Sequence, residues 1–298
     1  MSARGFTLVE LVVTMSVSTV VVAFAAMFVS VPVQGFMDQS RRVRLVDAAD
    51  SAVQRMKRDV RRALPNSLRV TTNGSIVALE LIRTLDGARY RERPPGGPAA
   101  MLDFSAADDS FNIIGDFTQI TKPFSSTTSY LSVYNVGVPG ANAYELSNVI
   151  TPVGTQIDIV DAALPGEDRV TLSPAFQFAW GSPGQRIFLA DGPVSYLCDT
   201  AADTLTRYSG YSIATAHAAR DSAAELLAAG AISDVVADRI GACSFAYSPG
   251  TAERSAVLTI EVQVTEDGET VDLLVQTHVV NTPRVGCLTI MRSSAVYR

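Results

Sequence analysis

One long apolar stretch near the amino terminus constrains this chain more than any other feature. It runs from Phe6 to about Val31, and Glu10 is the one charged residue within it. As a helix it spans about 39 Å, which is enough to cross a bilayer with some tilt. A charge inside a bilayer costs about 2.5–3.5 kcal/mol on insertion scales, so an acid at this position needs a specific role.

The residues at the start of this stretch resemble the class III signal of type IV pilin-like proteins. They are the run Arg4-Gly5-Phe6-Thr7-Leu8-Val9-Glu10, followed directly by the apolar helix. In that family, prepilin peptidase cuts after the glycine and the new amino terminus is methylated. The resemblance implies cleavage after Gly5, N-methylation of Phe6 and a role in assembly for Glu10.

This implied role of Glu10 has a physical basis. A cut after Gly5 exposes an α-amine on Phe6, which is cationic near neutral pH. Glu10 lies about one helical turn further along the chain. In a filament, Glu10 of one subunit is expected to neutralise the amine of a neighbour, which removes much of the cost of burying two charges. The same pairing sets the axial register of the incoming subunit.

Two alternatives to this interpretation of the amino terminus are open. Ala23-Phe24-Ala25 resembles the cleavage site of an ordinary secretory signal, with Arg4 as its basic region. An acid at position 10 and the length of the apolar stretch argue against that signal. In the second alternative, Glu10 only extends toward the interface from the end of a membrane anchor.

The second part of the predicted helix is amphipathic, from about Phe36 to Leu64. Apolar residues recur there at spacings of three and four, and Pro65-Asn66 ends the pattern. The repeating positions are Leu45, Ala49, Val53, Met56, Val60 and Ala63. Pro32 and Gly35 predict a kink or local unwinding between the two parts.

The sequence after Pro65 is typical of strands and turns. Asn73-Gly74 predicts a hairpin between residues 68–71 and 76–82, and a final hairpin turns at residues 266–269. Asp86-Gly87 predicts a further turn. Other expected strands are 88–91, 111–117, 130–136, 169–172, 186–189, 194–198 and 204–208. Helices are expected at 214–229 and 232–240.

These patterns together predict an α+β fold with a long amino-terminal helix packed on a large β-rich head, as in pilins. The expected divisions are a leader at 1–5, a membrane or filament-core helix at 6–34, the soluble half of the helix at 35–64 and the head at 65–298. At 47% hydrophobic and 18% charged residues, the chain has enough apolar residues to form a folded core. A net charge of −6 argues against general nucleic-acid binding.

Three cysteines, Cys198, Cys243 and Cys287, permit one disulfide and leave one thiol over. The favoured pair is Cys198–Cys243, because both lie beside strand-like segments and an oxidising periplasm allows a bridge. The sequence leaves the other pairings open.

No residue pattern indicates catalysis or a bound cofactor. The chain has only two histidines, His217 and His278, and lacks zinc-protease, phosphate-loop and dinucleotide motifs. The acid pairs Asp199/Asp203 and Asp108/Asp109 have too few ligands for a calcium loop. We therefore expect neither an enzyme nor a metal protein.

Several internal segments resemble the minor pilins of mannose-sensitive haemagglutinin (MSHA) pili, the MshO-type biogenesis proteins. These segments are 46–52, 58–67, 86–91, 194–198, 243–247 and 278–283. The resemblance implies a minor pilin that helps to initiate or cap a type IV pilus and contributes to adhesion. Its partners would be prepilin peptidase, major and minor pilins, the inner-membrane assembly platform and the lipid bilayer.

The same resemblance implies a single-pass protein of the inner membrane with a periplasmic head, which later reaches the cell surface in a pilus. Arg41, Arg42 and Arg44 follow the apolar stretch, and the positive-inside rule alone would place that side in the cytoplasm. Pilin leaders are inserted with the amino terminus inside, which favours the opposite orientation. The alternatives are a J-type pseudopilin of type II secretion, or an envelope binding protein with one membrane anchor.

Overall fold

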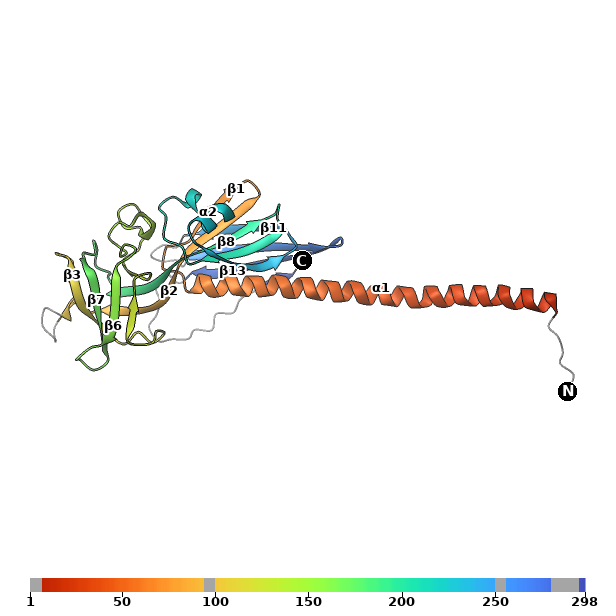
Figure 1. Ribbon diagram of the computed structural model, residues 1–298, viewed down its shortest axis with the longest axis horizontal. Helices are drawn as coiled ribbons and strands as arrows, with labels where there is room; N and C mark the ends of the chain where they lie inside the picture. Colours follow the sequence, from red (N-terminus) through yellow and green to blue (C-terminus); the bar gives the residue numbers. More distant parts are fainter. Residues whose placement is uncertain (1–6, 94–99, 250–255, 280–294, 298) are drawn as a thin grey trace.

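A single long helix dominates the computed structural model, which describes residues 7–93, 100–249, 256–279 and 295–297. This helix, α1 (Leu8–Arg61), has 54 residues and is about 80 Å long. Its first half projects away from a β-rich head and its second half lies against that head (Figure 1). The predicted α+β fold is confirmed.

The unwinding predicted near Pro32 and Gly35 is wrong, because α1 is helical through both positions. Proline lacks one backbone donor, but its fixed φ is close to the helical value. The neighbouring turns therefore carry the helix through this position.

The head contains two antiparallel sheets. The larger, ten-stranded sheet has the order β10-β9-β8-β2-β3-β7-β6-β4, with β1 added on β2 and β5 on β8, and the smaller has the order β11-β12-β13-β14. The strands of the larger sheet are β1 (Arg69–Asn73), β2 (Ile76–Tyr90), β3 (Asp108–Ile114), β4 (Phe124–Ser126), β5 (Tyr130–Val133), β6 (Gln156–Asp161), β7 (Glu167–Phe176), β8 (Arg186–Asp199), β9 (Thr204–Ser209) and β10 (Ile232–Asp238). Those of the smaller sheet are β11 (Ile240–Ser248), β12 (Ala256–Glu266), β13 (Glu269–Val279) and β14 (Ala295–Tyr297).

Strands β2 and β8 are long and run through two parts of the head. They pair from Ile76 opposite Asp199 to Arg89 opposite Arg186, with a break in register between Arg83 and Asp86. On one side of this break lies the proximal half, where both sheets pack with α1. On the other side lies the distal half, built from β3 to β7 beyond the carboxyl end of α1 (Figure 1). Each half has its own apolar core.

The helix packs on the proximal half through the stripe predicted from the sequence. All six predicted residues are buried, the last of them just beyond the end of the helix: Leu45, Ala49, Val53, Met56, Val60 and Ala63. They share one core with inward-facing residues of β12 and β13, such as Ile260 and Leu273. The apolar face of the helix, formed by residues three and four positions apart, thus packs against the apolar faces of the strands, formed by every second residue.

The carboxyl end of α1 is fixed at the junction between the two halves. The backbone N–H of Leu64 donates to the carbonyl of Ile82 (2.7 Å), and that of Thr84 donates to the carbonyl of Arg62 (2.7 Å). The residues after the helix thus satisfy polar backbone groups where the register of β2 and β8 breaks.

The helix predicted over Ile232–Ile240 is wrong. This segment forms β10, which pairs antiparallel with β9 from Ile232 opposite Ser209, and then enters β11 at Ile240. A short apolar run does not distinguish a strand from a helix by periodicity alone. Pairing with β9 satisfies its backbone groups and decides the conformation.

The turn predicted at Asp86-Gly87 is also wrong, because both residues lie inside β2. The carboxylate of Asp86 accepts from the backbone N–H of Gly87 (2.7 Å) and of Gln119 (2.7 Å). These bonds occupy the side chain at the irregular part of the strand. Likewise, the separate strands predicted at 186–189 and 194–198 form one strand, β8.

The helix predicted over 214–229 is confirmed only in part. It is represented by a single 3-10 turn, η3 (His217–Ala219), and by α2 (Ala223–Ala228). The guanidinium of Arg69 accounts for the loss of the first turn. It donates to the carbonyls of Ala214 and Thr215, both at 2.8 Å, and so takes acceptors that a helix would use.

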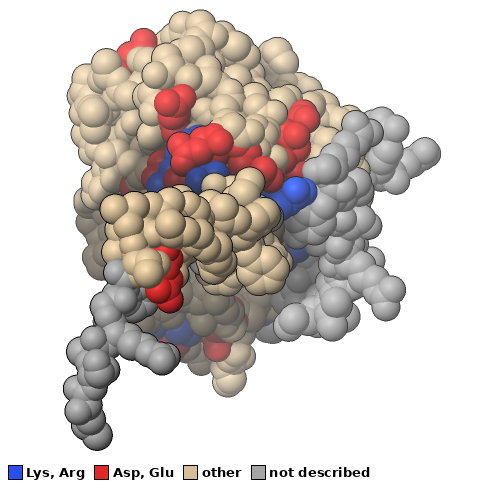
Figure 2. All heavy atoms as spheres, turned by 90° about the vertical axis from the view of Figure 1, so that its right-hand side faces the viewer, with Lys and Arg blue, Asp and Glu red and all other residues tan. Residues whose placement is uncertain are grey.

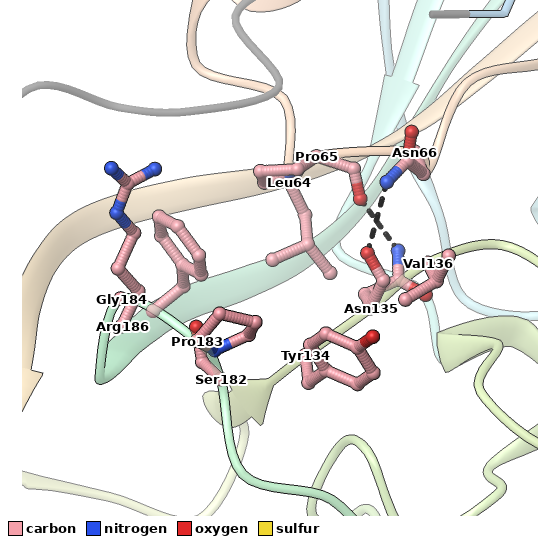
Figure 3. A pocket seen from close by; sticks show the side chains of 11 residues that line it. Leu64, Pro65, Asn66, Tyr134, Asn135, Val136, Ser182, Pro183, Gly184 and Arg186 are labelled. Atoms are coloured by element: carbon pink, nitrogen blue, oxygen red, sulfur yellow. Dashed lines mark hydrogen bonds between the residues drawn. The ribbon is translucent and has the colours of Figure 1, made fainter. Parts of the chain in front are cut away.

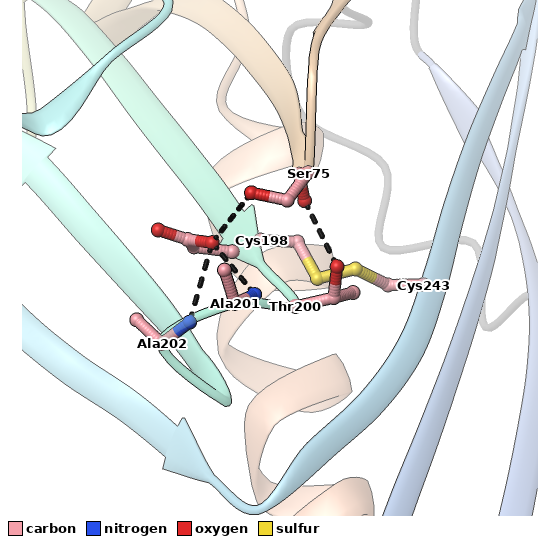
Figure 4. Close-up of a disulfide and its surroundings, with 7 residues drawn as sticks. Ser75, Cys198, Thr200, Ala201, Ala202 and Cys243 are labelled. Carbon is pink, nitrogen blue, oxygen red and sulfur yellow. Dashed lines mark hydrogen bonds between the residues drawn. A yellow bond between two sulfur atoms is a disulfide. The ribbon is translucent and has the colours of Figure 1, made fainter.

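Cys198 in β8 and Cys243 in β11 form a disulfide, with their Cα atoms 6.5 Å apart. This is the pair that the sequence favours, and Cys287 lies outside the described residues. The bond joins the two sheets beside the turn where Ser75 donates to Asp199 (Figure 4). It closes a loop with a sequence separation of 45 residues.

Removing this disulfide is expected to lower the free energy of unfolding by about 2–4 kcal/mol, because the unfolded chain regains loop entropy. Urea unfolding of the full chain in a nonionic detergent, with and without reductant, measures the loss. The double variant Cys198→Ser/Cys243→Ser should have the same free energy of unfolding as the reduced wild type, and adding reductant should not change it. A reductant effect of similar size in that variant would contradict the assignment.

A buried polar cluster anchors the segment after β9 to β1 and β2. Glu80 is fully buried, accepts from Arg69 Nε (2.5 Å) and from the Tyr211 hydroxyl (2.9 Å), and lies 3.9 Å from His217 Nε2. Burial raises the pKa of Glu80, although the charge of Arg69 opposes this. Burial, helped by the charge of Arg69, lowers the pKa of His217 to about 4.

The lowered pKa of His217 predicts a loss of stability in acid. The imidazole of His217 binds a proton near pH 6.5 in the unfolded chain and only near pH 4 in the folded chain. Between these two values, acid therefore favours the unfolded chain, and the free energy of unfolding that His217 contributes above pH 6.5 is lost as the pH falls. At about 1.4 kcal/mol for each pKa unit, the full loss is on the order of 3 kcal/mol. His217→Gln should lose less stability than the wild type between pH 7 and pH 4.5, whereas His278→Gln, at an exposed position, should behave like the wild type. Equal losses in all three proteins would contradict this prediction.

Candidate functional site

The first half of α1 is almost entirely apolar, and each of its side chains that the structure describes is exposed. Residues 7–28 and 33–39 are exposed, and the first buried residue of the helix is Leu45. This part of the helix is long and apolar enough to cross a membrane, by length and composition. Because the head covers none of these residues, their apolar surface requires another environment, either lipid or protein.

The helix begins close to the predicted cleavage point. Gly5 and Phe6 lie outside the described residues. Thr7 is the N-cap, and its hydroxyl accepts a hydrogen bond from the backbone N–H of Glu10 (3.2 Å). This cap fixes the start of the helix at Leu8 and places Glu10 in the first turn, where the helix dipole favours an acid.

The carboxylate of Glu10 has no hydrogen-bond or ion-pair partner within the part of the chain that the structure describes. The residue is exposed, and its neighbours Val9 and Leu11 are exposed apolar side chains. A partner for this charge must therefore come from solvent, from lipid or from another chain. Its pairing with the amine of a neighbouring subunit stays a prediction.

Three hydroxyl groups in the same exposed segment are satisfied within the helix. Thr14 donates to the carbonyl of Leu11 (3.0 Å), and Ser16 donates to that of Val12 (2.8 Å). Thr19 makes the same kind of bond one turn further on. Such bonds let hydroxyl side chains enter an apolar environment. Glu10 has no comparable bond, so it is the polar side chain in this segment that most needs an external partner.

Charged residues surround the point where α1 leaves the head. Arg41 pairs with Asp38 (3.4 Å) and with Asp267 (3.3 Å), and Arg42 pairs with Glu269 (3.4 Å). Figure 2, viewed toward the head from the amino-terminal side, shows acidic and basic side chains gathered behind the tan surface of the projecting helix. Exposed pairs of this kind contribute about 0–1 kcal/mol each. These ion pairs lie where the apolar part of α1 ends and its polar part begins.

The cysteines and the acid pairs singled out in the sequence make contacts within the fold. Cys198 and Cys243 are bonded to each other, so neither is a free nucleophile. Asp199 accepts from the backbone N–H of Ala201 (2.9 Å), and Asp108 accepts from that of Ser110 (3.0 Å). Within the described ranges, no group of three or more histidine, cysteine, aspartate or glutamate side chains is arranged to hold a metal ion.

Comparison with known proteins identifies the amino terminus. Residues 1–26 match the family model for the prokaryotic N-terminal methylation motif. The chain matches none of the curated proteins and none of the solved structures with which it was compared. The motif implies processing by prepilin peptidase and assembly with pilins, and the apolar helix fits a single-pass membrane anchor. Together, the matched motif and the exposed helix that follows it support a type IV pilin-like protein.

Proposed function

We propose that this chain is a minor pilin of a type IV pilus, of the MshO type found in MSHA systems. Prepilin peptidase removes residues 1–5, and α1 then holds the protein in the inner membrane with the head in the periplasm. The observation that carries this proposal is the exposed apolar half of α1, in which Glu10 has no partner among the described residues. A permanent anchor needs the apolar surface but not the acid.

The proposed assembly step moves the exposed helix from lipid into a filament core. Both environments are apolar, so the transfer changes little in hydrophobic energy. The pairing of Glu10 with the methylated amine of a neighbour's Phe6 supplies the specific interaction. An acid and an amine that are both buried are stable only as a pair, so the pairing favours one axial position over others.

The size and shape of the head support a low-copy position in the filament. The head has both a proximal half packed on α1 and a distal half that extends beyond the carboxyl end of the helix (Figure 1). Repeating such a head at every subunit would crowd a helical array. We therefore place the protein at the tip, where it initiates or caps the pilus and presents the distal half for adhesion. This role is structural and requires no catalytic centre.

Deletion of the gene, followed by complementation with the wild-type chain, tests this role. The deletion should strongly reduce the number of surface pili counted by electron microscopy, and the wild-type chain should restore it. Unchanged pili with failed exoprotein secretion would contradict the proposal in favour of a pseudopilin. Unchanged pili and unchanged secretion would favour an envelope binding protein.

A further inference from the structure

A hollow of about 450 Å³ lies at the junction between the proximal and distal halves of the head. Segments far apart in the sequence line it: residues 64–66 after α1, residues 134–136 after β5, and residues 182–188 at the start of β8 (Figure 3). Leu64 and Phe188 supply a buried apolar wall, and Tyr134 adds an exposed aromatic ring. The hollow thus combines apolar surface with access from solvent, as small-molecule sites do.

An arginine without an acidic partner lies at the rim of this hollow. Arg186 is half-buried, and its guanidinium makes no ion pair or hydrogen bond with the rest of the described chain. Its cross-strand neighbour in the β2–β8 register is another arginine, Arg89. Arg89 donates to Gln185 (2.9 Å), whose side-chain amide donates in turn to the carboxylate of Glu92 (2.6 Å). Like charges directly opposite each other on a sheet are destabilising, and among the described residues no acid pairs directly with either arginine.

The backbone around the hollow is held in an unusual conformation. Tyr134 has φ of 59°, in the left-handed region that a bulky residue rarely adopts. Asn135 holds this conformation because its side chain donates to the carbonyl of Pro65 (2.7 Å) and accepts from the N–H of Ala143 (2.9 Å). Asn66 also donates to the carbonyl of Asn135 (3.0 Å). Backbone strain that is held in place in this way clusters at active sites, ligand clamps and switch regions.

From these observations we infer that the hollow binds a small ligand with a carboxylate group and a compact apolar or ring-shaped body. The planar fork of Arg186 matches the two oxygens of a carboxylate. The body of the ligand packs between Leu64, Tyr134 and Phe188. Binding also relieves the repulsion between the two arginines, since the anion neutralises part of their charge. This site does not depend on the proposed role in a pilus.

Benzoate and benzamide test this site, because they share one shape and differ in charge. Binding is measured by ligand-observed NMR with the full chain in a nonionic detergent. Benzoate should bind the wild type at least about tenfold more tightly than benzamide, as expected for a charge-assisted contact. Arg186→Gln should remove this difference, and Arg186→Lys should retain part of it. Arg58→Gln, which alters an exposed arginine on α1, should leave it unchanged.

The stability of the Arg186→Gln variant separates a ligand site from a structural arginine. The variant should unfold at the same denaturant concentration as the wild type or at a slightly higher one, because a like-charge pair is removed. Loss of benzoate binding together with a clear loss of stability would contradict the proposal. Equal binding of benzoate and benzamide, or unchanged benzoate binding by Arg186→Gln, would also overturn it.

Discussion

Replacement of Glu10 by alanine is expected to prevent incorporation of the chain into filaments, while insertion into the membrane continues. In the proposed filament core, the methylated amine of a neighbour's Phe6 would then be buried without a counter-charge. Removing one partner of a buried ion pair costs about 3–5 kcal/mol, which corresponds to a loss of about two to four orders of magnitude in incorporation. Immunoblots of sheared surface filaments and of membranes measure the two pools.

The matched control for this prediction is Asp47→Ala, which removes an exposed acid from the covered half of the same helix. This variant should enter filaments normally. Mass spectrometry should show that the Glu10→Ala protein is still cut after Gly5, because the affected step is assembly. Normal incorporation of Glu10→Ala would favour a separately acting envelope protein.

Replacement of Asp59 by alanine is expected to lower the free energy of unfolding by about 3–5 kcal/mol. Asp59 lies near the end of α1 and binds two residues of the large sheet. It accepts from the Tyr196 hydroxyl (2.7 Å) and from Arg207 Nε (2.7 Å). Because Arg207 is buried, the variant would leave its guanidinium in the core with only the Ser209 hydroxyl as a side-chain partner.

Urea unfolding of the full chain in a nonionic detergent measures this effect. Asp47→Ala again serves as the control and should change stability by less than about 0.5 kcal/mol. The double variant Asp59→Ala/Arg207→Leu should recover part of the loss, because it removes the unpaired charge as well. A change below about 0.5 kcal/mol in Asp59→Ala would show that this ion pair does not hold the helix on the head.

The elements that could be predicted from the sequence are those with a strong local signal. The buried stripe of α1 follows from apolar residues at helical spacing between positions 45 and 63. The hairpin between β1 and β2 follows from Asn73-Gly74, and the one between β12 and β13 follows from the turn at residues 266–269. In each case, the residues that decide the structure are close together in the chain.

The missed elements depend on partners that are distant in the sequence. Asp86-Gly87 is typical of a turn, yet it lies in β2, which pairs with β8 across an irregular register. Similarly, the segment that begins at Ile232 forms a strand because its backbone pairs with β9. Tertiary pairing overrides local preference at these positions.

The same distinction applies to the functional residues. Gly5, Phe6 and Glu10 belong to one short motif, so the sequence alone is enough to propose them, and their individual roles stay predictions. The hollow at the junction is formed by segments about 50 to 70 residues apart, and no local pattern connects them. Arg186 is recognisable only from the strand register, which shows Arg89 opposite it and no acid as its partner.

Mass spectrometry of the amino-terminal peptide, taken from the chain in sheared surface filaments, tests whether a freed amine is present to pair with Glu10. The peptide should begin at N-methylated Phe6, so that its amine can meet Glu10 of a neighbour. A chain in filaments that still carries residues 1–5, or one that begins at Met27 after a secretory cut, would contradict this prediction.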